Sequence, residues 1–247
     1  MWMLVVLFLA GLWAGTQNAL AGGGSFITLP ALILSGLDAR AANITSTIAL
    51  FPGQVTTAWA GRSLVAGTER LSVRTLVLVS LVGGVVGGAL LLATPSEFFA
   101  RLVPWLVLFA TSVFAWGSFR SKSESRVILG ATGAIAVQFA IAVYGGYFGG
   151  GIGFLMLAAL TMAGLGVRVA TATKNVLAAV MNASAVVVFL FVGGIDWLKV
   201  AVLAAGAIAG GMGGAWALHR VNERVLRVVV VAIGLALTVG LFLRDRP

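Results

Sequence analysis

The chain is built from long apolar runs, and two of these runs are interrupted by three consecutive glycines. One triplet occupies residues 22–24 within the run 2–34, and the other occupies residues 149–151 within the run 127–165. Glycine costs about 1 kcal/mol in a helix interior relative to alanine, so three in a row predict a broken helix. Inside a bilayer, freed backbone groups are tolerated only where they are buried in protein or line a wet cavity. Broken helices at paired places in two halves of a chain indicate the binding site of a membrane carrier.

Composition places the chain in a membrane. Hydrophobic residues make up 60% of it, charged residues 9%, and the mean hydropathy is +1.10. A soluble surface needs charges at roughly a quarter of positions or more, so a soluble protein is excluded. The net charge of +9 is spread over short connections, which indicates membrane orientation rather than nucleic-acid binding. There is no cysteine, so disulfides, thiolate metal sites and thiol catalysis are excluded.

The apolar pattern predicts an all-α polytopic integral membrane protein with about 8–10 membrane segments and no separate soluble domain. The stretch at residues 2–21 ends like a signal peptide, but it has no preceding basic residue and has a counterpart inside the chain, so we interpret it as a membrane helix. We expect helices over residues 2–21, 26–34, 41–60, 76–93, 102–119, 127–148, 169–192, 198–218 and 225–243, with a further helix start near Ile152.

The second half of the chain repeats the first. The glycine triplets are 127 residues apart, Arg40 and Arg168 are 128 apart, and Glu97 and Glu223 are 126 apart. Because these offsets differ by so little, two small insertions or deletions account for them, and a duplication is predicted. The polar linker 120–126 then separates a first membrane repeat, residues 1–119, from a second, residues 127–247.

The basic residues predict the orientation of the two repeats. If each glycine-broken unit is a hairpin that returns to its starting side, the cytoplasmic loops hold ten Lys or Arg and the opposite side holds five. If each unit crosses once instead, the split is nine to six. The hairpin arrangement is favoured, and it makes the two repeats inverted in the membrane. Its cytoplasmic loops are residues 61–74, 120–126, 164–168 and 219–227.

Helix starts after the glycine breaks are candidate anion sites. A helix N-terminus carries free N–H donors and about half a positive charge. Lys174 is the only Lys or Arg well inside an apolar segment, and all seven acidic residues lie in predicted connections. A bound anion is therefore one candidate partner for its ammonium; the alternative is that Lys174 snorkels to the cytoplasmic surface. The candidate substrate-binding residues are Gly22, Gly23, Gly24, Ser25, Asn43, Thr45, Ser46, Gly149, Gly150, Gly151, Thr173, Lys174 and Asn175.

Three further polar residues are interpreted as interhelical hydrogen-bonding groups rather than ligands. They are Gln54, Gln138 and Asn182. Gln54 and Asn182 are 128 residues apart, which makes them counterparts in the two repeats.

The glycine motifs and the polar segments that follow them resemble those of a known family. The runs GGGSFITLP at 22–30 and ANITST at 42–47, then GGYFGGGIG at 145–153 and ATATKN at 170–175, are similar to the paired motifs of the sulfite exporter family TauE/SafE. The resemblance spans nearly the whole chain. It implies a multi-pass permease of the bacterial inner membrane for sulfite, organosulfonates or other small anions, usually exporting. The second motif departs from the family pattern, because Lys174 stands where an uncharged residue is common.

Two other classes of function remain as alternatives. An intramembrane serine hydrolase would use Ser25 with Lys174 as base, but the counterpart of Ser25 is Ile152 and no membrane-embedded His or carboxylate supports the pair. A passive scaffold subunit would transport nothing. We expect alternating access, in which one repeat rocks against the other around a central anion site, with no cofactor and no metal. The substrate, the coupling ion and the oligomeric state, a homodimer included, stay open.

Overall fold

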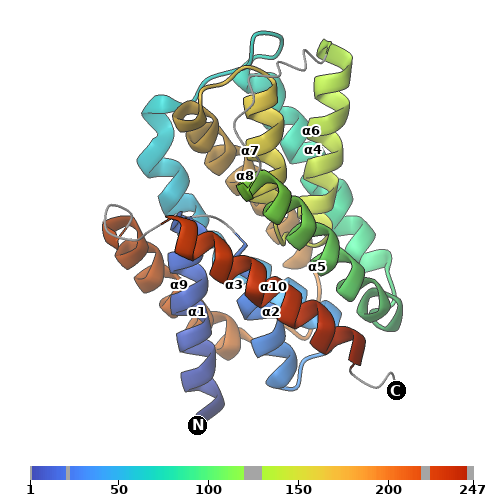
Figure 1. Ribbon diagram of the computed structural model, residues 1–247. Helices are drawn as coiled ribbons and strands as arrows, with labels where there is room; N and C mark the ends of the chain where they lie inside the picture. Colours follow the sequence, from blue (N-terminus) through green and yellow to red (C-terminus); the bar gives the residue numbers. More distant parts are fainter. Residues whose placement is uncertain (1, 21–22, 120–129, 218–222, 244–247) are drawn as a thin grey trace.

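The computed structural model describes residues 2–20, 23–119, 130–217 and 223–243, and all of the regular structure in these residues is helical (Figure 1). The first helices are α1 (Trp2–Leu20), α2 (Ser25–Leu34), α3 (Ala39–Gly61), the short 3-10 helix η1 (Arg62–Leu64), α4 (Val73–Ala93) and α5 (Ser96–Phe119). The remaining helices are α6 (Ala131–Tyr147), α7 (Ile152–Met162), α8 (Val167–Phe189), α9 (Trp197–Ala217) and α10 (Glu223–Leu243).

The predicted all-α polytopic membrane fold is confirmed. Within the described ranges, three segments are both long and apolar enough to cross a bilayer: Val73–Ala93, Ser96–Val113 and Arg168–Phe189. The expected start of the fifth helix was wrong, because α5 begins at Ser96 rather than at residue 102. Glu97 lies in its first turn, where a carboxylate favours the positive helix end, and the Phe99 amide already donates to the Pro95 carbonyl at 2.9 Å. The linker 120–126 lies outside the described residues.

Side-chain caps fix where two of the long helices begin. The Asp38 carboxylate accepts hydrogen bonds from the amides of Arg40 at 3.0 Å and Ala41 at 3.1 Å, which starts α3. The Ser72 hydroxyl accepts the Thr75 amide at 3.2 Å, which starts α4. Both helices therefore begin two or three residues earlier than their apolar pattern suggested.

Helices from the two ends of the chain are interleaved. α1 packs along α9, and α6 packs along α4; likewise α3 contacts α9, and α8 contacts α4. The short helices lie on their sequence neighbours, α2 on α3 and α7 on α8, while α3 and α8 contact each other. α5 and α10 pack together and cross the bundle (Figure 1). These contacts come in matching pairs: α1 with α9 matches α6 with α4, α3 with α9 matches α8 with α4, and α2 with α3 matches α7 with α8.

Glycines bring the interleaved helices close together. A Cβ on Gly210 of α9 would lie 2.7 Å from the carbonyl carbon of Leu12 in α1. A Cβ on Gly87 of α4 would lie 2.7 Å from the amide nitrogen of Tyr147 in α6. Real Cβ atoms do not approach this closely, so glycine is what allows these backbones to touch, as in small-residue packing of membrane helices.

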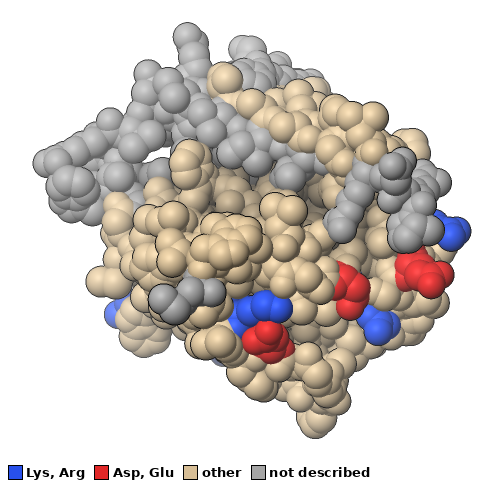
Figure 2. Space-filling view, turned by 90° about the horizontal axis from the view of Figure 1, so that it is seen from below, with Lys and Arg blue, Asp and Glu red and all other residues tan. Residues whose placement is uncertain are grey.

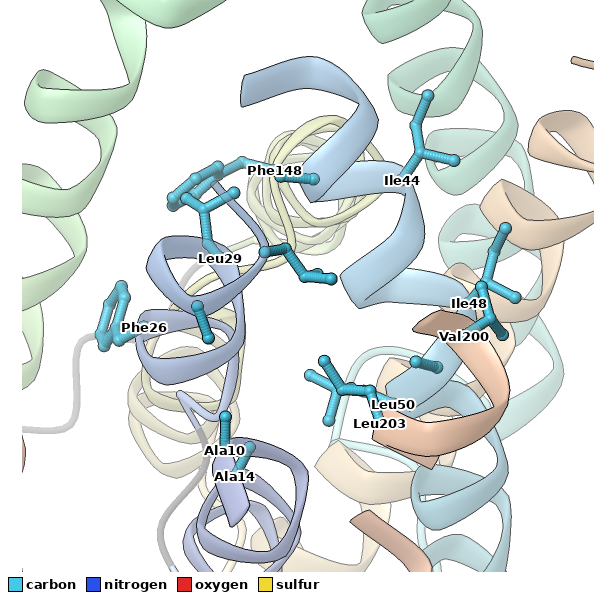
Figure 3. Close-up of a cluster of buried hydrophobic side chains, with 14 of the residues drawn as sticks. Ala10, Ala14, Phe26, Leu29, Ile44, Ile48, Leu50, Phe148, Val200 and Leu203 are labelled. Carbon is cyan, nitrogen blue, oxygen red and sulfur yellow. The ribbon is translucent and has the colours of Figure 1, made fainter. Parts of the chain in front are cut away.

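The buried side chains form two apolar cores. One core contains residues of α4, α6, α7 and α8, among them Leu76, Met156 and Met181. The larger core is built mainly on α1, α2, α3, α5 and α9. Figure 3 shows part of the larger core, in which side chains of α3 such as Ile48 lie beside Val200 of α9.

Charged side chains are sparse on the end of the molecule seen in Figure 2. The described Lys, Arg, Asp and Glu residues there are few and mixed in sign, with uncharged surface between them.

Candidate functional site

The first glycine break is held by polar side chains at the end of α1. The Asn18 carbonyl oxygen accepts the Gly24 amide at 2.8 Å, and the Gln17 amide donates to the Gly23 carbonyl at 3.2 Å. Gly23 has φ +84°, a left-handed conformation that favours glycine, and α2 starts two residues later at Ser25, with Gly24 as its N-cap. Gly22 lies outside the described residues. Gln17 and Asn18 were not among the predicted site residues.

The second break uses backbone geometry instead of side-chain caps. Gly149 and Gly151 both have φ +76°, and Gly151 directly precedes the first residue of α7. The N-cap residues of α7 and α2 are both glycines, Gly151 and Gly24. Neither residue has a side chain that could accept a hydrogen bond from the first turn of its helix. The first turn of α7 therefore presents backbone N–H groups without a carboxylate or hydroxyl from its cap residue. In α2 the amides of Phe26 and Ile27 already donate to the Gly23 and Gly24 carbonyls at 3.0 Å.

The N-terminal part of α3 contacts both broken units. The Asn43 amide donates to the Tyr147 carbonyl at 3.0 Å, just before the second break. The Ser46 and Thr28 hydroxyls lie 2.5 Å apart, and Thr28 belongs to the first turns of α2. Asn43, Ser46 and Thr28 are all at most 1% exposed. The structure thus brings predicted residues of α3 together with both breaks and adds Thr28, which the sequence reasoning missed.

Aromatic rings lie beside the second glycine triplet. The Phe26 ring reaches to 3.6 Å from the place of a Cβ on Gly151, and the Phe148 ring packs against Gly150. Both rings are 1% exposed, and Figure 3 shows them with Leu29 at one side of the larger core. The starts of α2 and α7 are therefore close in space, with apolar rings beside them.

Among the described residues, Lys174 is the one buried Lys or Arg. It lies within α8 and is only 7% exposed. Within the described residues, no acidic side chain forms an ion pair with its ammonium. Ser46, which lies 128 residues earlier in the sequence, hydrogen-bonds to Thr28 in the first turns of α2. An unpaired buried ammonium is costly, so its position calls for an anionic partner.

The other predicted residues of α8 and α3 have different surroundings. The Thr173 hydroxyl lies 3.1 Å from both the amide and the carbonyl of Ala66, so it binds the segment after η1 rather than a helix break. Thr45 is buried at 3% exposure, while Ser25 and Asn175 are half-buried. No hydrogen bond or ion pair joins these four residues to one another in the described part of the chain.

The amides predicted to link helices do so. Gln138 donates to the Ser80 hydroxyl at 2.8 Å, joining α6 to α4. Asn182 donates to the Gln54 carbonyl oxygen at 2.6 Å, joining α8 to α3. Asn182 is 2% exposed, and its own carbonyl oxygen is buried without a partner among the described residues.

A polar cluster fastens the connection between α2 and α3 to that between α4 and α5. Asp38 accepts from the Ser96 hydroxyl, and the Arg40 guanidinium donates to the Thr94 carbonyl at 2.9 Å. Partial burial by itself would raise the pKa of Asp38, but the hydrogen bonds from Ser96, Ala41 and Arg40 and the Arg40 charge lower it below 3.8. The carboxylate is therefore ionised at neutral pH. No cluster of three His, Asp or Glu side chains suited to a metal lies within the described residues.

Comparisons with known proteins agree with this architecture. The family described as "Sulfite exporter TauE/SafE" matches residues 7–241. A probable membrane transporter protein of Sinorhizobium is 28% identical over 97% of this chain and 92% of its own length. The probable membrane transporter protein YfcA of Escherichia coli is 24% identical over 97% and 89%, and one from Haemophilus influenzae is 28% identical over 96% and 93%. Together with the helical membrane fold, these matches identify the chain as a membrane transporter that belongs to the sulfite exporter TauE/SafE family.

Proposed function

We propose that this transporter carries a small oxyanion, with sulfite or an organosulfonate as the first candidates, out of a bacterial cell across the inner membrane. The observation that carries the proposal is Lys174, a buried ammonium with no acidic partner among the described residues. A bound anion would neutralise the charge of the Lys174 ammonium and accept its hydrogen bonds. The family description supports the sulfur oxyanion class.

The helix starts supply the rest of the proposed site. α7 begins inside the bundle after glycines, so its first turn offers N–H donors and partial positive charge where water is scarce. α2 contributes the positive end of its helix dipole, since its Phe26 and Ile27 amides already donate to Gly23 and Gly24. Ser46 lies against the first turns of α2, and Lys174 holds the equivalent place in α8. We therefore expect the Lys174 ammonium to lie beside the first turns of α7 and to act with its backbone donors.

Transport by this site would use alternating access between inverted repeats. Figure 1 supports this arrangement: α1 rises from the lower end and α2 returns to it, whereas α6 descends from the upper end and α7 returns upward. The interleaved contacts have the same symmetry. If α1 corresponds to α6 and α4 corresponds to α9, the contact of α1 with α9 is equivalent to the contact of α6 with α4. An arrangement with equivalent states open to either side follows from such symmetry.

The aromatic rings define the closed state in this scheme. Phe26 and Phe148 pack against Gly151 and Gly150 and are almost fully buried. An anion can reach the backbone donors of α7 only after these rings turn away. We assign them the role of an apolar cover that keeps the site dry until it loads.

Anion flux into proteoliposomes tests the function. Purified protein would be reconstituted and assayed with sulfite, taurine, sulfate, nitrate and chloride. Lys174→Met is expected to reduce flux of the carried anion at least tenfold, and Gly23→Leu is expected to do the same because a side chain does not fit its left-handed backbone. Lys199→Met is the matched control, because Lys199 lies at the start of α9 and pairs with Asp196 at 3.1 Å.

The outcomes separate the alternatives. Wild-type and Lys199→Met protein should transport one anion class at similar rates. Equal transport by Lys174→Met and wild type would remove Lys174 from the site. No flux of any anion with correctly folded protein would favour a passive scaffold instead.

A further inference from the structure

The hydrogen bond between Gln54 and Asn182 joins two equivalent residues of the proposed repeats. They are 128 residues apart and occupy the same position in α3 and α8, which are both 23 residues long. Their amides meet at 2.6 Å. In a structure with pseudo-twofold symmetry, two equivalent residues can touch only on the symmetry axis. The contact therefore marks the axis between the repeats, an argument that rests on the proposed inverted-repeat transporter.

The packing divides the bundle into two bodies that are not the sequence halves. Body A comprises α1, α2, α3 and α9, and body B comprises α6, α7, α8 and α4. Tight glycine contacts hold α9 to α1 and α4 to α6, so each body takes one helix from the other half. The smaller apolar core consists of residues of body B and of Leu71, two residues before α4. The larger core joins body A to Leu91 of α4 and to Ala185, Val186 and Phe189 of α8, so it also forms part of the interface between the bodies. A rotation of one sequence half relative to the other would separate the helices that these glycine contacts join.

The interface between the bodies is centred on the antiparallel pair α3 and α8. A Cβ on Gly61, at the end of α3, would lie 3.5 Å from the Ala172 Cβ near the start of α8. Along α8, Ala172 is ten residues before Asn182, which corresponds to about 15 Å. The interface thus has a central polar contact and at least one distant apolar contact.

We infer that the Gln54–Asn182 pair is the pivot of the transport cycle, about which body A and body B rotate. In the opposite state of the transport cycle, each repeat adopts the conformation that the other repeat has in this one. A contact between two non-equivalent residues is then replaced by the contact between their two counterparts. A contact between equivalent residues is converted into itself, so it persists in both states. The unpartnered Asn182 carbonyl oxygen fits this role, because an exchange of states reverses which amide donates and which accepts.

Cross-linking can separate a pivot from a gate, and the chain has no native cysteine to interfere. Gln54→Cys with Asn182→Cys would be bridged by a short bis-methanethiosulfonate. A linker is needed because the native contact joins the ends of the Gln54 and Asn182 side chains, and cysteine side chains are shorter. Gly61→Cys with Ala172→Cys is the matched off-axis pair, and its Cβ separation of 3.5 Å suits a direct disulfide. Each bridged protein is compared with its own reduced form in proteoliposomes.

The pivot predicts that bridging residues 54 and 182 leaves at least half of the anion flux of the reduced form. Bridging residues 61 and 172 should lower flux at least tenfold, with recovery on reduction. Loss of flux on bridging 54 to 182, restored by reduction, would overturn the pivot and make the pair a gate that opens.

A second measurement keeps the pivot testable if no anion flux is found at all, a result that would refute the proposed function only. Nitroxide pairs at the same two sets of positions would be measured by dipolar broadening of the continuous-wave EPR spectrum, which suits labels this close together, with and without sulfite and across a series of pH values. The pivot predicts one unchanged distance at 54–182 and a changed or second distance at 61–172. A changed distance at 54–182, or one distance at both pairs under all conditions, would overturn it.

Discussion

Replacing Gly210 by alanine tests whether α1 and α9 form one tightly packed unit. The new Cβ would lie 2.7 Å from the Leu12 carbonyl carbon and 2.9 Å from the Leu12 Cα, and these backbone atoms cannot turn aside. The two helices would have to separate by roughly 1 Å, a change that overpacking studies put at about 1–3 kcal/mol. For a chain of 247 residues, 1 kcal/mol corresponds to roughly 2–4 °C in Tm, so we expect Gly210→Ala to lower Tm by about 2–12 °C.

Gly213→Ala is the matched control, because it lies in the same helix and nothing lies within 4 Å of its Cβ position. Its Tm should stay level or rise slightly, since alanine is the better helix former. The assay is thermal unfolding in detergent, followed by tryptophan fluorescence and by the monodisperse fraction on size exclusion. Equal Tm values for the two variants would refute the close packing of α1 on α9, and with it the division into two bodies.

Three other substitutions test single contacts. Thr173→Val removes the hydroxyl that binds both backbone groups of Ala66, so we expect a loss of about 1–2 kcal/mol and faster proteolysis of residues 62–72. Asn18→Ala leaves the Gly24 amide without its acceptor; Tm should fall by an amount corresponding to about 1 kcal/mol, and an unchanged Tm would show that Asn18 does not hold the break. Asp38→Ala should cost about 1 kcal/mol at pH 7 through loss of the α3 cap. Because the folded-state pKa of Asp38 is below 3.8, its stabilisation is present above that value and lost as pH falls through the folded pKa, so wild type and variant should converge below pH 4.

Much of the fold could be predicted from local features of the sequence. The apolar runs locate the helices because a chain in lipid must satisfy its backbone within each segment, and the glycine triplets locate both breaks. The start of α3 was missed by two residues because its signal is the Asp38 cap rather than hydrophobicity. The pattern of apolar residues gave no information on which long helices pack together, since lipid-facing and protein-facing sides of a membrane helix are equally apolar.

The candidate site could be predicted only in outline. Lys174 stood out because charge is rare in an apolar run, and the structure buries it. Gln17 and Asn18 were missed because polar residues at the end of an apolar run indicate a helix end as readily as a backbone cap; their position a few residues before the first triplet was the available signal. Thr173 adjoins Lys174 in sequence, and its hydroxyl bonds to the backbone of Ala66, a contact that no local feature of the sequence indicated.

The location of a bound anion tests the central claim most directly. Selenite has the shape and charge of sulfite, and its selenium gives a strong anomalous signal in a crystal of the purified protein. We expect one anomalous peak inside the bundle, within about 3–4 Å of the Lys174 ammonium and of backbone amides in the first turn of α7 or α2. A peak confined to the basic loops, with α2 and α7 still covered by Phe26 and Phe148 at saturating selenite, would contradict the account.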